Sequence, residues 1–526
     1  MSDEILFSEI ERLDGKFEAF ASQPHESEKT VFGGGPDSDS ITNNITPEYR
    51  RGWGIVGPND APTMQDFNAL GFLTTQVLAY LHQVGVPHWH AAQGYQQGAL
   101  AIHGGELWQA RSATINQPPP PENPADWVRL SKSPLTGDIT VTVGAGGDYP
   151  TINAALEDLS AKYYPAYIAG GFTATVQLLS GFVMAEQVVV KGVDLGWITI
   201  TALDPVTTID TAGLVDDYPV GFGFKAAFSG LSGAVLPNIG VLFQMGAAGA
   251  DDYPGILLYE HARATVLPGA GVKNAKSNGL MIVNGSSAIA DDAIFSGAAG
   301  HGISLNNGRV QAVRVDCSNA GGNGIFAENG SHAVIDKCDC SHAGENGISA
   351  EGRSTVQASE ADCSNAGKVG IYADDASIIE ADKATCEGCA DWGVLAKGAS
   401  TINCPEVVAQ NCGGPGGPGV AGGIGALRGS TINAEVADCS GCVGSYAVLA
   451  DCGSMVNANY ANLSGSGGRG VGVSSGSTVN AQGADCSGAA GDGIEVSGGS
   501  TVNAQLSTGT TSVTPNTLTA AGIIFK

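Results

Sequence analysis

The sequence predicts a mainly β fold: a right-handed single-stranded parallel β-helix, preceded by a small α-helical and β N-terminal region. Three observations lead to this prediction. The C-terminal half repeats about every 23 residues, each repeat holds short alternating apolar and polar runs, and one residue type recurs at the same place in successive repeats. A composition of 77 glycines and only 6% aromatic residues suits a fold with many tight turns.

Residues 1–51 and 52–87 are predicted to contribute one amphipathic helix each, the first followed by a loop or extended arm. The second helix has a Thr63-x-x-Asp66 box at its start and Gly85 as a stop signal. Apolar residues in both helices follow heptad spacing. Such a seam can pack within the core of one subunit, or it can pack against identical helices around a symmetry axis. We assign the following residues to this trimer or anchor seam: Leu6, Ile10, Leu13, Phe17, Phe20, Phe67, Leu70, Val77, Leu81 and Val84.

Residues 88–132 are predicted to form a small β module. Alternating runs lie around Tyr95 and over residues 107–110, and Trp127 closes the segment. Tyr95, Trp108 and Trp127 are the candidate glycan-binding residues, because exposed aromatic rings can stack on sugar rings. In so small a module, however, we favour the interpretation that the same rings form its core.

Residues 133–203 are predicted to start and cap the β-helix. The stretch 138–160 contains a strand, a glycine turn and a short helix opened by Thr151 or Asn153. A helical cap is expected where the open end of a parallel stack would expose strand edges. The body of the β-helix then spans residues 204–505, and residues 506–526 are expected to form a C-terminal tail.

The repeat is clearest from residue 278 onward. Its marker glycines, 22 or 23 residues apart over the first six, are Gly279, Gly302, Gly324, Gly347, Gly370, Gly393, Gly470 and Gly493. Runs such as GIFAE and AVIDKC are separated by turn residues, so each repeat makes several short strands. Coils of this length stack at about 4.8 Å, and parallel crossovers are right-handed by default.

Three residue types form columns in the stack. Cys317, Cys340, Cys363 and Cys386 recur every 23 residues, which predicts an internal column of buried thiols, with metal or redox chemistry as the alternative. Cys338 and Cys340 are expected to alternate between strand faces. Asp316, Asp339 and Asp362 precede the cysteines and should point outward, either as a solvated stripe or as weak candidates for cation binding. Asparagines in a [ST]-x-N motif from Asn403 onward are expected to hydrogen-bond between coils.

Charge excludes several classes of partner. The net charge is −28, which disfavours nucleic acid and anionic lipid. No stretch approaches the roughly 20 apolar residues of a membrane span, and the acidic N-terminus MSDEILFSEI is not a secretory signal. We expect reduced cysteines, synthesis in a cytoplasm, no membrane insertion, no metal centre and no cofactor.

The sequence resembles bacteriophage tail fibre and tailspike proteins with a pectin-lyase-like β-helix. The resemblance is carried by GWGIVGPNDAPTMQDFNALGFLTTQVLAYL (52–81), VGAGGDYPTINAAL (143–156), the NGI…GS.V.A…CS.AG coils and the ending LTAAGIIFK (518–526). Residues 88–130 are similar to small carbohydrate-binding modules of chitinases but lack their adjacent tryptophan pair. The resemblance implies a homotrimer in the virion tail, made in the host cytoplasm. Its N-terminal region would dock on baseplate proteins, and its β-helix would face a receptor on the bacterial surface.

Many proteins of that architecture cleave capsule or lipopolysaccharide. Glycoside hydrolysis needs two carboxylates about 5–5.5 Å or 6.5–9.5 Å apart, whereas a lyase needs a base. The candidate catalytic acids are Asp291, Asp292, Asp374 and Asp375. Stacking alone places many acids about 5 Å apart, so no motif singles out a pair. We therefore favour attachment without catalysis, with a depolymerase and a structural baseplate component as alternatives.

Overall fold

The computed structural model describes residues 45–52, 63–91, 93–115, 126–130, 132–165, 171–214, 226–246, 253–414, 420–509, 517–518 and 522–525, and four positions between 33 and 43. The chain divides into two units, Met1–Ser133 and Pro134–Lys526, and each is considered by itself. Within these described ranges, no helix combines the length and apolar character that a membrane crossing requires.

The N-terminal unit contains the helices α2 (Pro47–Arg51) and α3 (Met64–Val84). The predicted box at the start of α3 is confirmed: the backbone N–H of Asp66 donates to Thr63 Oγ1 at 3.1 Å, and that of Thr63 donates to Asp66 Oδ2 at 3.4 Å. α2 lies in the segment that was expected to be a loop or arm. Its N-cap is Thr46, whose hydroxyl accepts from the backbone of Tyr49.

α3 carries apolar residues on two faces. One face is buried and contains Ala69, Phe72, Leu73 and Ala79. The other contains Met64, Phe67 and Leu78, which are 56%, 55% and 51% exposed. Together with Thr74, these three follow heptad spacing, so an open stripe runs along the helix.

The predicted seam is described only in part. Phe67 lies on the open stripe, and Leu70 is partly buried beside it. Of Val77, Leu81 and Val84 only the backbone is described. The remaining seam residues lie outside the described part of the chain: Leu6, Ile10, Leu13, Phe17 and Phe20.

The module that follows α3 is antiparallel. β2 (Leu100–His103), β3 (Glu106–Ala110) and β5 (Trp127–Arg129) form one sheet, and β1 (Gly94–Tyr95) pairs with β4 (Thr114–Ile115). These strands enclose a small core of their own.

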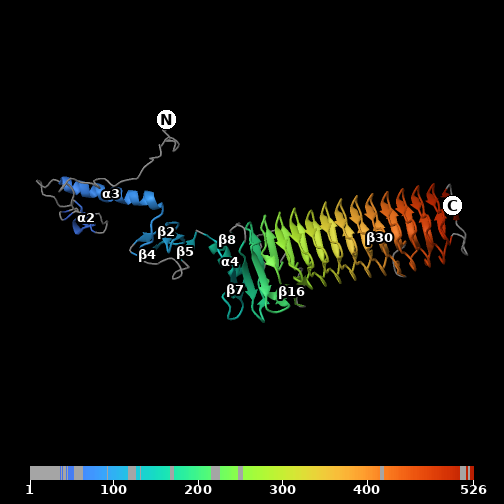
Figure 1. Cartoon of the computed structure of the whole chain (residues 1–526), viewed down its shortest axis with the longest axis horizontal. Helices are drawn as coiled ribbons and strands as arrows, with labels where there is room; N and C mark the ends of the chain where they lie inside the picture. The colour runs from blue at the N-terminus through green and yellow to red at the C-terminus, as the bar shows by residue number, and fades with distance from the viewer. Residues whose placement is uncertain are drawn as a thin grey trace, which may run out of the picture. The chain divides into compact units, whose positions relative to one another are not determined.

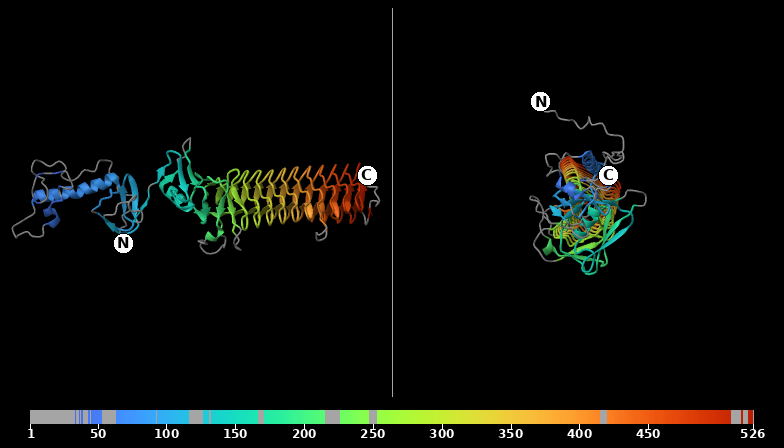
Figure 2. Two further views of the ribbon diagram at one scale, coloured as in Figure 1. Left: turned by 90° about the horizontal axis from the view of Figure 1, so that it is seen from below. Right: turned by 90° about the vertical axis from the view of Figure 1, so that its left-hand side faces the viewer.

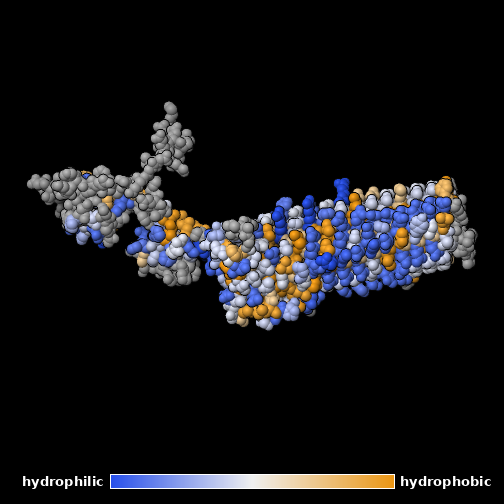
Figure 3. Space-filling model, viewed as in Figure 1, coloured by the Kyte–Doolittle hydropathy of each residue, from blue (hydrophilic) through white to orange (hydrophobic). Residues whose placement is uncertain are grey.

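The second unit is a parallel β-helix with three faces, seen as stacked coils in Figures 1 and 2. Each regular coil adds a strand to a long sheet, a strand to a second sheet, and a single-residue bridge to a third face. Hydrophilic residues cover most of the coil surface visible in Figure 3, and apolar residues gather at the broad N-terminal end.

The described strands of the long sheet number 14: β11 (Val188–Lys191), β14 (Phe228–Leu231), β17 (Ile256–Tyr259), β20 (Leu280–Val283), β22 (Ile303–Asn306), β24 (Ile325–Glu328), β26 (Ile348–Ala350), β28 (Ile371–Ala373), β30 (Trp392–Ala396), β32 (Gly422–Leu427), β34 (Tyr446–Asp451), β36 (Arg469–Val473), β38 (Ile494–Val496) and β40 (Thr517–Leu518). Those of the second sheet number 12: β18 (Arg263–Thr265), β21 (Ser287–Ile289), β23 (Arg309–Gln311), β25 (His332–Val334), β27 (Thr355–Gln357), β29 (Ile378–Glu380), β31 (Thr401–Asn403), β33 (Thr431–Asn433), β35 (Met455–Asn457), β37 (Thr478–Asn480), β39 (Thr501–Asn503) and β41 (Ile523–Phe525).

The broad end adds shorter sheets. One contains β7 (Ile139–Val143), β9 (Ala174–Leu178), β12 (Ile198–Ala202) and β15 (Asn238–Ile239); another contains β10 (Val183–Met184), β13 (Thr207–Ile209), β16 (Leu242–Met245) and β19 (Gly271–Lys273). β6 (Ser133–Pro134) pairs with β8 (Tyr163–Tyr164), and a short 3-10 helix spans Thr211–Gly213.

α4 (Ile152–Lys162) lies at the start of the β-helix, beside β7 and β8 (Figure 1). Thr151 is its N-cap, and the carboxylate of Glu186 accepts from the backbone N–H groups of Ile152 and Asn153. Burial raises the pKa of Glu186 despite these bonds. Apolar side chains of α4 belong to the main core, so the helix occupies the position expected for a cap.

The chain after residue 505 is not only a tail, contrary to the prediction. β40 pairs with β38 and β41 pairs with β39, which adds a further coil. The physical reason is that apolar and polar residues still alternate here. Ile524 pairs with Val502 and packs against the core, so its burial extends the stack.

The predicted cysteine column is internal. Cys317, Cys340, Cys363 and Cys386 are fully buried with free thiols. The marker glycines lie against them: a Cβ atom on Gly347 would stand 2.6 Å from the Cβ of Cys363 and 2.7 Å from a backbone oxygen. Glycine is therefore required where the thiol column fills the corner of each coil. The same close approach to a cysteine recurs at Gly302, Gly324, Gly370, Gly423 and Gly470.

The expectation that Cys338 and Cys340 point to opposite faces is wrong. Both are buried, and their Sγ atoms are 3.6 Å apart. Lys337 has a φ of 61°, in the left-handed region, so the chain turns before Cys338 and strand alternation does not apply.

A buried serine column was not predicted. The hydroxyl of Ser377 accepts from the backbone N–H of Ser354 at 3.1 Å, and Ser400 accepts from Ser377 in the same way. These bonds satisfy backbone donors at the corner before each strand of the second sheet. The remaining serines of the column are Ser286, Ser331, Ser430, Ser454, Ser477 and Ser500.

Candidate functional site

Two columns of side chains stand on the outer face of the long sheet, between β22 and β30. They alternate with inward apolar residues such as Ile348 and Ala350, because strand neighbours point to opposite faces. The first column contains Ser304, Phe326, Ser349, Tyr372 and Leu395. The second contains Asn306, Glu328, Glu351, Asp374 and Lys397.

Phe326 and Tyr372 lie on either side of Ser349 in the first column. Ser349 is fully buried, whereas both rings remain partly exposed. The rings are two coils apart, or about 10 Å at the usual strand spacing. They provide two apolar surfaces with a polar floor between them, a combination typical of ligand sites.

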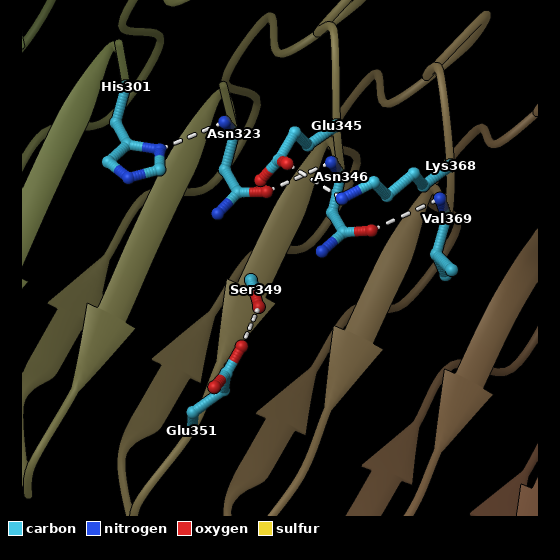
Figure 4. Close-up of polar contacts among 8 residues, drawn as sticks. All are labelled: His301, Asn323, Glu345, Asn346, Ser349, Glu351, Lys368 and Val369. Carbon is cyan, nitrogen blue, oxygen red and sulfur yellow. Dashed lines mark hydrogen bonds and ion pairs between the residues drawn. The ribbon is translucent and has the colours of Figure 1, made fainter.

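Glu351 and Asp374 stand beside these rings on adjacent coils. Ser349 Oγ donates to Glu351 Oε1 at 3.1 Å (Figure 4). The Tyr372 hydroxyl donates to Asp374 Oδ2 at 2.7 Å, and the backbone N–H of Asp375 donates to Asp374 Oδ1 at 2.8 Å. Both carboxyl groups are therefore held in position by the first column.

Burial raises the pKa of Glu351, and the negative charges of Asp374, Glu328 and Asp375 raise it further. Burial and the bond to Asp374 also raise the pKa of Tyr372, so its hydroxyl stays protonated. A carboxyl group with a raised pKa is better suited to act as a general acid than an ordinary glutamate. The neighbouring carboxylate, that of Asp374, stands on the next coil, and adjacent strands are about 4.8 Å apart.

A row of polar residues borders this region on the side of the marker glycines. His301 Nδ1 accepts from the backbone N–H of Asn323, and the side-chain oxygens of Asn323 and Asn346 accept from the next coil (Figure 4). Burial lowers the pKa of His301, which therefore remains a neutral acceptor, although the charge of Glu345 opposes this. The ring of His301 packs at 5.0 Å from that of Phe326.

Two lysines flank the rings. Lys368 Nζ pairs with Glu345 at 2.6 Å (Figure 4), and Lys397 Nζ lies 5.4 Å from the centre of the Tyr372 ring. Lys368 is exposed, so its ion pair contributes little to stability, whereas Lys397 is partly buried. They provide positive charge beside an otherwise acidic column.

The predicted acids fall into two separate groups. Asp292 forms two bonds of 2.6 Å with Arg314, and Asp291 accepts from Gln311 and the backbone of Val313. Both lie at the turn after β21, on another corner of the coil from Asp374. The structure therefore does not place Asp291 and Asp292 beside Asp374. Instead, Asp291 and Asp292 bond to residues of the next coil.

Asp375 has a different place from its neighbour Asp374. It is exposed, with a φ of 53° in the turn after β28, and only its backbone bonds to the carboxylate of Asp374. Of the predicted DD pair, Asp374 alone belongs to the ordered outer face.

Asp316, Asp339 and Asp362 stack outward on the third face, as expected. Each carboxylate accepts from the backbone N–H of the serine two residues later, at 2.9–3.0 Å. These bonds close local turns and account for the recurring Asp-Cys-Ser sequence. In the part of the chain that the structure covers, no three His, Cys, Asp or Glu residues form a group suited to a metal ion.

Tyr95, Trp108 and Trp127 form the core of the small module. They are 7%, 8% and 1% exposed, and the Tyr95 and Trp127 rings meet edge to face at 5.2 Å. Of the two interpretations, the structure agrees with the module core, because packing against one another covers the ring faces that would stack on a sugar. The Tyr95 hydroxyl still borders a pocket lined by His88, His90, Gln93 and Gln96.

Sequence reasoning missed Phe326, Ser349, Glu351 and Tyr372. A signal was present: Glu328, Glu351 and Asp374 each stand four residues after a marker glycine, and Phe326 and Tyr372 stand two after. The repeat pattern does not show that Glu351 is more buried than the other acids, and this burial is what distinguishes it.

Comparison with known proteins concerns the fold. A family model described as a right-handed beta helix region matches residues 254–404 and, in an overlapping match, residues 301–444. No curated protein matches the chain. The fold-class prediction is thus confirmed: the body is a right-handed parallel β-helix.

Proposed function

We propose that this right-handed parallel β-helix is the receptor-binding body of a bacteriophage tail fibre or tailspike, and that it attaches the virion to a glycan or protein of the bacterial surface. The protein is made in the host cytoplasm and acts in the virion tail as a homotrimer. The N-terminal unit anchors it to the tail baseplate.

The observation that carries the proposal is the outer face of the long sheet. Phe326 and Tyr372 offer two partly exposed rings, and Asn306, Glu351 and Asp374 offer hydrogen-bonding groups beside them. Sugars present apolar ring faces and hydroxyl groups together, so this mixed strip suits a glycan better than a flat acidic surface would. We call the strip formed by Phe326, Ser349, Glu351, Tyr372 and Asp374 the receptor strip.

The anchoring role rests on α3. Its open apolar stripe of Met64, Phe67 and Leu78 has heptad spacing, which suits packing between identical helices around a threefold axis. The resemblance of residues 52–81 to tail proteins supports the same assignment.

Cleavage of a bacterial polysaccharide is the second candidate function. It is favoured by one observation: Glu351 has a raised pKa and lies one coil from Asp374, so the pair has the chemistry of a proton donor and a carboxylate partner. Glu351 would give its proton to the glycosidic oxygen as that bond breaks, and the Asp374 carboxylate would form a bond to the anomeric carbon. Water, deprotonated by Glu351, would then break that bond and restore both groups.

Binding to bacterial cells tests the proposal. Fluorescently labelled full-length protein is titrated onto a panel of strains, and the supernatants are analysed for new reducing ends. Attachment predicts saturable binding to particular strains that is weakened in the F326A/Y372A variant but retained in T385D, a change on the third face. Absence of saturable binding to every strain would oppose attachment and favour a structural role.

The same assay separates attachment from cleavage. If the receptor strip is catalytic, wild-type protein releases sugar ends, whereas E351Q still binds the cells saturably and releases none. If it only binds, neither protein releases products.

A further inference from the structure

The outer face of the second sheet lacks charge over its last regular coils. Five strands, β31, β33, β35, β37 and β39, place two outward residues each on this surface. We call it the Thr/Asn face, and it consists of Thr401, Asn403, Thr431, Asn433, Met455, Asn457, Thr478, Asn480, Thr501 and Asn503. None of these ten side chains is ionisable, although the chain carries a net charge of −28.

The asparagines of this face bond to one another along the stack. The amide of Asn433 donates to Asn403 at 2.7 Å, that of Asn457 donates to Asn433 at 2.8 Å, and that of Asn503 donates to Asn480 at 2.9 Å. Polar groups that already have partners lose little when water is removed from them. Covering this face therefore costs less free energy than covering the acidic outer face of the long sheet.

Exposed apolar side chains gather on and beside the Thr/Asn face. Met455 is 55% exposed within it, and the next strand of the second sheet, β41, adds Ile523 and Phe525 at 50% and 56%. The bordering turn adds Val436, Tyr460 and Leu506 at 52%, 55% and 74%. Up to the first coil of the face that turn instead carries ion pairs such as Lys383 with Glu406, and it becomes apolar from Val436, after β33.

We infer that the Thr/Asn face is the surface through which copies of this chain pack against one another along the β-helix. This inference rests on the proposed homotrimer and names the face that meets the symmetry axis. Interfaces between identical chains are depleted of charge at their centre and enriched in apolar residues. Acidic surfaces of two copies repel each other, so copies of this acidic chain associate most easily through an uncharged face.

The other two faces fit this role less well. Over its earlier coils the long sheet carries Glu328, Glu351 and Asp374 in one column, and over the next coils its outer apolar residues Trp392, Leu395 and Leu449 are already buried in a cluster of their own. The third face carries Asp316, Asp339, Asp362, Asp438 and Asp485. Two such columns placed opposite each other would bring like charges together, which costs free energy unless cations intervene. Packing through the Thr/Asn face leaves both acidic faces, and the receptor strip, turned to solvent.

The native thiols offer a direct test without any substitution. Cys452 is exposed, while the other eleven cysteines are buried. It lies in the turn before β35, at the margin of the Thr/Asn face. If that face surrounds a threefold axis, the Cys452 thiols of the copies come close together; if it faces outward, the width of the coils separates them.

The experiment treats full-length protein with a short bis-maleimide and examines it on a denaturing gel, with the native mass measured by light scattering. We expect covalent dimers and trimers in wild type and none in C452S. A native trimer without crosslinks would overturn the inferred face while leaving the homotrimer intact. A native monomer would overturn the homotrimer as well, so the two failures are distinguishable.

Charge placed on the face provides the matched comparison. T431D/T478D adds two negative charges to the Thr/Asn face, and T385D/N462D adds two to the third face, where aspartate already occupies equivalent positions. We expect loss of crosslinking in the first variant and no change in the second. Equal crosslinking in both variants would contradict the inference. The inference would also be contradicted if T431D/T478D formed crosslinks as efficiently as wild type but no longer bound cells. That result would assign the Thr/Asn face to receptor binding.

Discussion

Burial separates Glu351 from the other carboxylates of the long sheet. Its outward position was readable from the repeat, but its contact with the fully buried Ser349 was not. The raised pKa follows first from loss of water and then from the neighbouring acids. The result is a carboxyl group that is less acidic than its sequence context suggests.

E351Q should therefore be more stable than wild type at neutral pH. A glutamate whose folded pKa is raised binds its proton more readily in the folded state, so its ionisation costs stability as pH rises above the ordinary value of about 4.3. As the pH falls below that value the wild-type side chain becomes neutral in both states, and the difference shrinks. Melting curves at pH 7 and at about pH 4 measure this, with E360Q, an exposed acid, as the control. A lower melting temperature for E351Q at pH 7 would contradict the assignment.

The cysteines make a second residue-scale prediction. Burial raises the pKa of Cys486 to about 12, and the charge of Asp485 adds to the effect. A buried thiol of this kind is neither accessible nor ionised at neutral pH. Titration of native protein with a thiol reagent should detect one reactive group per chain, Cys452, and twelve after denaturation. More than one reactive thiol in the native state would contradict an internal column.

At the scale of the element, the repeating unit is the coil. At one corner of each regular coil a marker glycine lies against a buried cysteine. Gly347 and Cys363 are 16 residues apart in sequence, yet a Cβ atom on the glycine would overlap the cysteine. The period of the repeat reflects this contact. It explains why the marker glycine and the cysteine recur together.

G347A should be strongly destabilising. The added methyl group meets the Cβ of Cys363 and the backbone of the next coil, and overpacking of this kind typically costs about 1–3 kcal/mol. G414A is the matched control, because the nearest atom to its Cβ is 3.8 Å away. Thermal unfolding of the two variants compares them, and equal melting temperatures would remove the packing explanation.

The sequence predicted the coils better than the site because periodicity reports which face a residue occupies. The 23-residue period was sufficient for the cysteine, aspartate and asparagine columns. It failed at Cys338, where a left-handed residue in the turn breaks alternation. It also did not distinguish the turn acids Asp291 and Asp292 from Asp374, since pairing with Arg314 or with Tyr372 depends on the three-dimensional corner each one occupies.

At the scale of the whole molecule, two surfaces suit self-association: the open stripe of α3 in the N-terminal unit and the Thr/Asn face of the β-helix. Both are uncharged in a chain of net charge −28. Within the β-helix, the proposed receptor strip lies on a different face from the Thr/Asn face. The proposed assembly and receptor binding would therefore use separate surfaces.

F67D/L78D should weaken the proposed trimer. The two charges interrupt the apolar stripe of α3, and in a three-chain seam each acid would face two others. The native mass by light scattering should fall toward that of one chain on dilution, while T385D/N462D keeps the trimer mass. An unchanged mass for F67D/L78D would show that α3 does not hold the copies together.

The most direct test of the central claim is binding of the full-length protein to an array of purified bacterial surface polysaccharides. The account predicts saturable binding to a small subset, reduced at least tenfold in F326A/Y372A (about 1.4 kcal/mol) and unchanged in T385D/N462D. Binding to none of the polysaccharides, or equal binding by F326A/Y372A and wild type, would contradict the claim that the outer face of the long sheet recognises the host.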